Sequence, residues 1–133
     1  MLLVEDIMTT KENLAVVSQM ASVREALKKM KDYQTHSVVV DKTHKEGAYG
    51  LLTFKNVLQS IVAEDGDIDL LNVYDICSMP AVSVSAKLEL KYAAKMMVTN
   101  SIKRLLVIDN NELFGIITMT DIITTLIESV EDI

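Results

Sequence analysis

The sequence predicts an α+β fold made of two tandem copies of a β-α-β-β-α unit, and three observations support this prediction. The 133 residues suffice for one compact domain, or for two small ones that share a core. Four blocks of sequence recur in the same order. Apolar residues at helical spacing alternate with short continuous apolar runs, which are typical of helices and of strands buried on both faces.

The internal repeat is visible block by block. Val4–Ile7 reads Val-Glu-Asp-Ile and returns 69 residues later as Val-Tyr-Asp-Ile at Val73–Ile76. Gly50–Thr53 returns 65 residues later as Gly115–Thr118. Blocks that keep residue type, spacing and order indicate a duplication. We therefore assign residues 1–66 to the first repeat and residues 67–133 to the second, joined by the acidic linker around Gly66.

The first half of each copy is predicted as a short extended piece followed by a helix. The extended pieces are Val16-Val17 and the run from Val82 to Val84. Apolar residues then recur at i, i+3, i+4 and i+7, from residue 23 to 30 and from residue 90 to 97. Each helix needs a cap at its start. In the first copy Ser22 and Glu25 form a capping-box pair, and in the second copy Ser85 is a plausible cap.

The second half of each copy is predicted as two strands and a second helix. Continuous apolar runs at 38–40 and 105–108 suit buried strands. A polar turn follows, and its tighter version at 109–112 is the better hairpin signal. The next strands, at 50–54 and 115–119, each run straight into an amphipathic helix.

Composition excludes several classes of function. The formal net charge is −6 and the isoelectric point about 4.8, so the surface repels phosphate backbones and we expect no nucleic-acid binding. The mean hydropathy is +0.26, yet no segment approaches the roughly 20 apolar residues of a membrane helix.

One cysteine and two distant histidines provide no metal site and no internal disulfide. The sequence contains no catalytic constellation, so we expect no enzyme activity. It also shows no signal peptide, so the expected location is the cytoplasm.

The strand–helix junction carries a repeated motif, Gly-h-h-Thr-x-x-Asp/Asn, where h is apolar. It reads Gly50 to Asn56 in one copy and Gly115 to Asp121 in the other. With the Val-x-Asp-Ile motif and the segment from Ile102 to Asp109, it resembles the CBS domain family over residues 4 to 127. The resemblance implies a CBS domain pair (Bateman module), two repeats related by a pseudo-two-fold axis. Its central cleft would hold an adenosine-containing ligand such as AMP, ADP, ATP or S-adenosylmethionine. Such pairs usually dimerise through their helices.

The second-copy junction has a physical use for such a ligand. A helix start leaves backbone N–H groups unpaired at the positive end of the helix dipole, which favours anions. The hydroxyl of Thr118 adds a phosphate donor, and Asp121 can accept from both hydroxyls of a ribose. An alternative needs no ligand, because Thr-x-x-Asp is also a capping-box pattern. The two interpretations are compatible.

The two junctions are not equivalent. The first copy has Thr53, Lys55 and Asn56, and asparagine is neutral with one acceptor oxygen. We therefore expect the site with Asp121 to be stronger, although Lys55 can meet a phosphate. Lys103 and Arg104 precede a strand where relatives often place phosphate-facing cations; the alternative is plain surface charge.

The first copy has Thr35-His36-Ser37 at that place, with a one-residue ambiguity in the alignment. A polar residue at a strand edge is the alternative for His36. If His36 faces the ligand, its protonation strengthens phosphate binding as the pH falls. The ligand-binding candidates are Thr118, Asp121, Thr120, Arg104, Lys103, Thr53, Asn56, Lys55, His36 and Val82.

The leading hypothesis is therefore a regulatory, ligand-sensing module. It needs no cofactor, and an adenine nucleotide or S-adenosylmethionine is its regulatory ligand. It would act on an unidentified effector protein or fused domain and form a homodimer. The alternative hypothesis is a ligand-free dimerisation or interaction scaffold, for which the apolar helix stripes at 57–62 and 122–127 would suffice. Cys77 is interpreted as a small packing residue.

Overall fold

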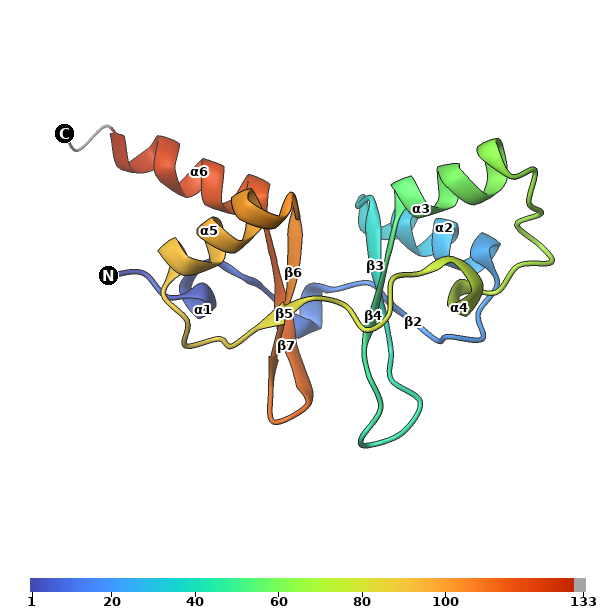
Figure 1. Cartoon of the computed structure of the whole chain (residues 1–133), viewed down its shortest axis with the longest axis horizontal. Helices are drawn as coiled ribbons and strands as arrows, with labels where there is room; N and C mark the ends of the chain where they lie inside the picture. Colours follow the sequence, from blue (N-terminus) through green and yellow to red (C-terminus); the bar gives the residue numbers. More distant parts are fainter. Residues whose placement is uncertain (131–133) are drawn as a thin grey trace. The chain divides into compact units, whose positions relative to one another are not determined.

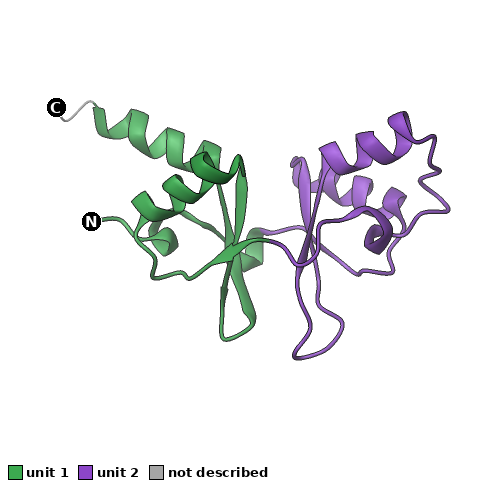
Figure 2. Ribbon diagram, viewed as in Figure 1, with its two compact units in different colours: residues 1–13, 82–133 green, residues 14–81 purple. Residues whose placement is uncertain are grey.

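A computed structural model describes residues 1–130, which form two compact units (Figures 1 and 2). Unit 2 comprises Leu14–Ala81, and unit 1 combines Met1–Asn13 with the chain from Val82 onward. The compact units therefore divide the chain differently from the sequence repeats 1–66 and 67–133. Each unit contains the central part of one repeat and the opening segment of the other.

Unit 2 has a three-stranded sheet with the strand order β2-β3-β4. β3 pairs in parallel with β2 and antiparallel with β4, and Ser37 at the start of β3 lies opposite Thr53 at the end of β4. Helices lie on one face of this sheet (Figure 1). The elements are β2 (Val16–Val17), α2 (Val23–Tyr33), β3 (Ser37–Val40), β4 (Gly50–Thr53), α3 (Phe54–Leu58), a π-helical turn (Gln59–Ala63) and α4 (Val73–Ile76).

Unit 1 repeats this plan with one more strand, in the order β1-β7-β6-β5. The extra strand comes from the start of the chain and pairs antiparallel with β7. The elements are α1 (Val4–Ile7), β1 (Thr9–Thr10), a 3₁₀ helix (Lys11–Asn13), β5 (Ser83–Val84), α5 (Leu90–Asn100), β6 (Arg104–Asp109), β7 (Glu112–Thr118) and α6 (Met119–Val130). Two tandem β-α-β-β-α repeats in an α+β fold are therefore confirmed.

The helix starts follow the sequence in α2 but not in α5. Ser22 caps α2, because its Oγ accepts from the Glu25 N–H at 3.1 Å. The prediction that Ser85 caps α5 is wrong, since its Oγ accepts from the Lys87 N–H at 3.2 Å and closes a local turn. The helix begins later, after Glu89, whose side chain makes no capping hydrogen bond.

Each unit has its own hydrophobic core. The predicted helical stripes are buried: residues 23, 26 and 30 in unit 2, and residues 90, 93 and 97 in unit 1. They pack against the apolar runs of β3 and β6, as expected for strands buried on both faces. Each fully buried valine or leucine contributes about 1.5–3 kcal/mol. Within residues 1–130, none of the helices has the length and apolar character needed to cross a membrane.

The hairpin predicted at residues 109–112 is present. Asn110 and Asn111 both have left-handed backbone conformations, with φ of 52° and 59°. Two such residues in succession match the twist of the flanking strands, and asparagine tolerates this conformation well. The tight turn pairs Asp109 with Glu112, and the register then shifts by one residue between Ile108 and Val107. Beyond this shift, Arg104 lies opposite Thr118 at the other end of the hairpin.

Candidate functional site

The strand–helix junction of unit 1 is closed by a reciprocal pair of hydrogen bonds. β7 ends at Thr118, whose Oγ1 accepts from the Asp121 N–H at 3.1 Å. Asp121 Oδ2 accepts in return from the Thr118 N–H at 2.9 Å. This is the capping box, so the structural interpretation of Thr-x-x-Asp holds for this junction. What matters for a ligand is which groups the cap leaves free.

Several groups at this junction remain available. Both Thr118 and Asp121 are half-buried, and Asp121 Oδ1 makes no hydrogen bond within residues 1–130. The Thr118 hydroxyl accepts in the cap and still has a proton to donate. Thr120 is exposed in the first turn of α6, and its backbone N–H lies between those of Met119 and Asp121, which donate to the Lys103 carbonyl and to Thr118 Oγ1. The junction thus offers a carboxylate oxygen beside hydrogen-bond donors, which suits a diol next to an anion.

The two predicted cations belong to the same junction. Arg104 is the cross-strand neighbour of Thr118, and the carbonyl of Lys103 accepts from the Met119 N–H at 2.8 Å. Arg104 is half-buried and Lys103 is exposed. In the part of the chain that the structure describes, neither side chain forms an ion pair. Both positive charges are therefore free to balance a phosphate.

Val82 flanks the start of β6 on its other side. Its carbonyl accepts from the Leu106 N–H at 3.0 Å, and its side chain is exposed. An exposed valine beside polar groups supplies the apolar surface that a flat base requires. The unit 1 junction therefore brings together the predicted residues Val82, Lys103, Arg104, Thr118, Thr120 and Asp121.

The unit 2 junction uses the same cap but leaves fewer groups free. Asn56 Oδ1 accepts from the Thr53 N–H at 3.0 Å and from the Thr53 hydroxyl, also at 3.0 Å. Thr53 Oγ1 accepts from the Asn56 N–H at 3.3 Å. The single acceptor oxygen of the amide thus serves two donors within the cap, and the hydroxyl proton is used as well. A ribose would have to compete with the protein for both groups.

The strand register removes the alignment ambiguity around His36. The His36 carbonyl accepts from the Phe54 N–H at 2.8 Å, as the Lys103 carbonyl does from the first residue of α6. His36 is therefore equivalent to Lys103, and Ser37 is equivalent to Arg104. The sequence placed Ser37 in this segment, but only His36 was chosen as a candidate, because the residue opposite Thr53 depends on strand register. Lys55 is exposed at the start of α3.

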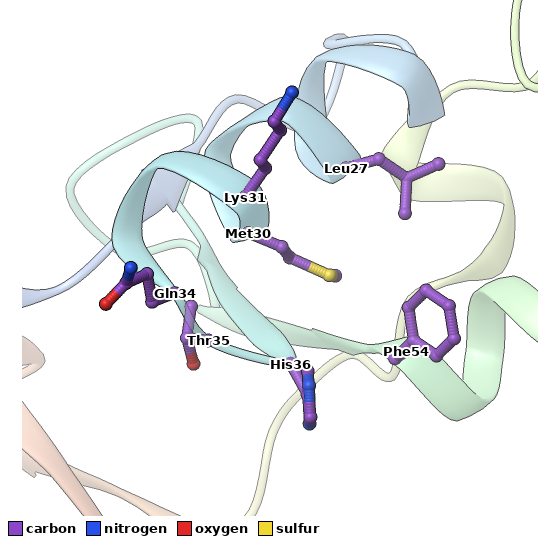
Figure 3. A pocket seen from close by; sticks show the side chains of 7 residues that line it. All are labelled: Leu27, Met30, Lys31, Gln34, Thr35, His36 and Phe54. Carbon is purple, nitrogen blue, oxygen red and sulfur yellow. The ribbon is translucent and has the colours of Figure 1, made fainter.

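A cavity of about 550 Å³ lies on unit 2, between the end of α2 and the starts of β3 and α3 (Figure 3). Leu27, Met30 and Phe54 line its apolar part, while Lys31 extends away from it. The His36 ring lies 6.2 Å from the Phe54 ring, centroid to centroid. Thr53, Lys55 and Asn56 do not line this cavity. Of the residues predicted to bind in the first copy, only His36 faces it.

Among residues 1–130, no group of three histidine, cysteine, aspartate or glutamate side chains could hold a metal ion.

The model of the CBS domain family matches residues 4–63 and 73–128 of this chain. An uncharacterized protein of Methanopyrus kandleri is 33% identical over 96 residues, which cover 71% of this chain and 48% of that protein. The chain therefore spans about half the length of this relative.

Solved structures that share the fold include those of two CBS proteins. The hexameric CBS-CP12 protein from bloom-forming cyanobacteria is 30% identical, with a TM-score of 0.88, and the match covers 98% of this chain and 74% of that one. CBSX2 from Arabidopsis thaliana is represented by a complex with AMP. That complex is 22% identical to this chain, with a TM-score of 0.77 and coverage of 95% and 96%.

Proposed function

Because the chain belongs to the CBS domain family, we propose that it is a regulatory, ligand-sensing module that binds an adenosine-containing molecule and modulates a partner. The observation that carries this proposal is the unit 1 junction. A free carboxylate oxygen, a threonine hydroxyl, the first turn of α6 and two cations that form no ion pair within residues 1–130 meet there at one end of the hairpin. This combination matches the two polar parts of a nucleotide, its ribose and its phosphate.

Each group has a defined role in the proposed complex. Asp121 Oδ1 accepts from a ribose hydroxyl, and the Thr118 hydroxyl donates to a phosphate oxygen. Arg104 neutralises the phosphate charge, with Lys103 as a more exposed second cation. Val82 gives the base an apolar contact. The CBSX2 complex with AMP, which has the same fold, supports an adenine nucleotide as the ligand class.

Regulation follows from differential affinity. A ligand that binds one conformation of the module more tightly shifts the equilibrium toward that conformation. It changes a coupled partner by the same free energy. In this proposal the partner is an effector protein or a fused domain, and the module needs no cofactor and catalyses no reaction. We place this regulation in the cytoplasm.

We also propose that the chain forms a homodimer through its helices. Apolar side chains at Leu58 and Val62 in unit 2, and at Ile123 and Ile127 in unit 1, are exposed on the helices that follow the junctions. Exposed apolar stripes of this kind mark interaction surfaces. The hexameric assembly of the CBS-CP12 protein supports self-association within this fold.

The second candidate function is a ligand-free interaction scaffold. The observation in its favour is that both junctions already close their own caps, so neither requires a ligand for local stability. The exposed helix stripes would then be the functional surface.

A thermal-shift panel separates the two functions. The purified protein is heated with AMP, ADP, ATP or S-adenosylmethionine, with uridine monophosphate as the base control. A ligand at 100 times its Kd adds about 2.7 kcal/mol to the free energy of unfolding. We expect a saturable shift with at least one adenosine compound and none with the uridine compound. If no adenosine compound shifts the melting temperature, the scaffold function is favoured.

A further inference from the structure

Unit 1 carries a second cavity, distinct from the junction, of about 440 Å³. It lies between the first turn of α5 and the middle of α6, beside the N-terminal segment of the chain. We call it the α5–α6 groove. Its apolar wall consists of Met1, Leu2, Leu90, Ala94, Ile122 and Leu126.

The duplication provides a comparison for this groove within the same chain. The Val23 N–H at the start of α2 donates to the Leu71 carbonyl at 3.0 Å. The Leu90 N–H at the start of α5 donates to the Leu2 carbonyl at 2.9 Å. The segment before α4 in unit 2 and the segment before α1 in unit 1 therefore pass these helix starts in the same way, and Leu71 in unit 2 is the counterpart of Leu2 in unit 1.

In unit 2 the corresponding groove is filled by the linker itself. Ile68 packs against the hydrophobic core, and its carbonyl accepts from the Arg24 N–H at 3.1 Å. The neighbouring Asp69 pairs with the guanidinium of Arg24, with a second contact of 3.0 Å from Nη2 to Oδ2. An aliphatic side chain, a backbone carbonyl and a carboxylate thus occupy this site together.

The same receptor groups are present in unit 1. Lys91 stands where Arg24 stands, and its backbone N–H has no acceptor within residues 1–130. Ala94 replaces the larger Leu27, which leaves more room in the groove. Glu89 adds a group that unit 2 lacks: its Oε2 is buried without a hydrogen bond and lies 3.4 Å from Lys91 Nζ. The ion pair balances the charge of Glu89, and the oxygen can still accept a hydrogen bond from an occupant that brings an N–H.

We propose that the α5–α6 groove docks an extended peptide segment of a partner protein, in which an aliphatic residue is followed by an acidic one. The aliphatic side chain enters the apolar wall as Ile68 does in unit 2, and its carbonyl accepts from the Lys91 N–H. The acidic side chain pairs with Lys91 Nζ, and a peptide N–H donates to Glu89 Oε2. The site is independent of the nucleotide site and gives the module a surface through which an effector can be held.

The probe for this proposal is a fluorescein-labelled peptide with the sequence of residues 64–69, Glu-Asp-Gly-Asp-Ile-Asp, because its last two residues are those seated in unit 2. Fluorescence anisotropy measures its binding to the full chain. We expect saturable binding that weakens at least 10-fold with Ala94→Glu and with a peptide carrying serine in place of isoleucine. Val98→Glu introduces the same charge on the exposed surface of α5, outside the groove, and should leave binding unchanged.

Two results would overturn the proposal. One is the absence of saturable binding up to about 1 mM peptide, which corresponds to a binding free energy weaker than about −4.1 kcal/mol. The other is equal binding by the wild type and the Ala94→Glu variant, provided that circular dichroism shows the variant to be folded. If the peptide does not bind and Ala94→Glu converts a dimer to a monomer, a second copy of the chain occupies the groove instead.

Discussion

Arg104 lies directly opposite Thr118 across the β6–β7 pair, and the corresponding neighbours in unit 2 are Ser37 and Thr53. One junction therefore carries a guanidinium where the other carries a small hydroxyl. Because the backbone register is the same in both, the difference between the units lies in side-chain chemistry. We therefore expect the two junctions to differ in how strongly they bind a phosphate.

Replacing this arginine tests the phosphate role. We expect Arg104→Ser, which copies unit 2, to weaken AMP binding about 10- to 150-fold, since a charge-assisted hydrogen bond contributes about 1.5–3 kcal/mol. Adenosine, which lacks the phosphate, should bind equally to the wild type and the variant. Isothermal titration calorimetry with both ligands measures this, and Lys28→Ser on the exposed face of α2 is the control. Equal losses for AMP and adenosine would contradict the assignment.

Replacing the carboxylate tests the ribose role. Asp121→Asn keeps an oxygen for the cap but loses the charge and the second acceptor, so we expect weaker binding of adenosine with little change in stability. Asp121→Ala also removes the reciprocal hydrogen bond from the Thr118 N–H, while the bond from the Asp121 backbone N–H to Thr118 Oγ1 remains, so we expect a loss of about 1 kcal/mol of stability. Calorimetry and urea unfolding distinguish the two effects. Asn56→Ala is the matched variant in unit 2, and equal losses of binding from Asp121→Ala and Asn56→Ala would refute the asymmetry.

The central part of each repeat was predictable from sequence for a physical reason. Strands buried on both faces need continuous apolar runs, so the runs Val38–Val40 and Leu105–Ile108 predicted the two buried strands. The exchange of opening segments was not predictable. Val4–Ile7 and Val73–Ile76 have the same apolar pattern, so either segment can satisfy either core, and only the folded chain selects between them.

The site was predictable in part. The Thr-x-x-Asp/Asn pattern located both junctions, because a strand that runs into a helix requires a cap at that point. The cross-strand position of Ser37 could not be found, because it depends on strand register. The second hydrogen bond to Asn56 Oδ1 also depends on three-dimensional geometry.

The core of unit 1 offers a test of stability. Met97 is 1% exposed and packs on the buried face of α5, so Met97→Ala leaves a cavity. We expect a loss of about 2–5 kcal/mol in the free energy of unfolding. Met20 is 71% exposed, and Met20→Ala should change stability by no more than about 0.5 kcal/mol. Urea denaturation measures both, and similar losses from the two variants would argue against the packing described.

Cys77 follows α4 and is half-buried. Burial raises the pKa of this thiol, and the nearby Asp75 carboxylate raises it further. The thiolate is the reactive form, so we expect alkylation by iodoacetamide at pH 8 to be slower than in the urea-unfolded chain. Mass spectrometry follows the modification over time. Faster reaction in the folded chain would indicate an activated thiol and contradict the packing role.

The pair of Arg24 and Asp69 predicts a pH dependence of stability. The hydrogen bond from Arg24 holds the pKa of Asp69 below its ordinary value, so the folded state favours the charged carboxylate. The stabilisation is therefore present above the ordinary pKa of aspartate and is lost as the pH falls through the lowered value. Asp69→Asn should destabilise the chain slightly at pH 7 and by less at pH 2. Because the pair is exposed, the effect at pH 7 should shrink in 1 M NaCl.

Urea unfolding of the wild type and the Asp69→Asn variant at the two pH values measures the difference, with Asp32→Asn on the exposed face of α2 as the control. If Asp69→Asn lowered the free energy of unfolding as much at pH 2 as at pH 7, Asp69 would act through the backbone of the linker rather than through its charge.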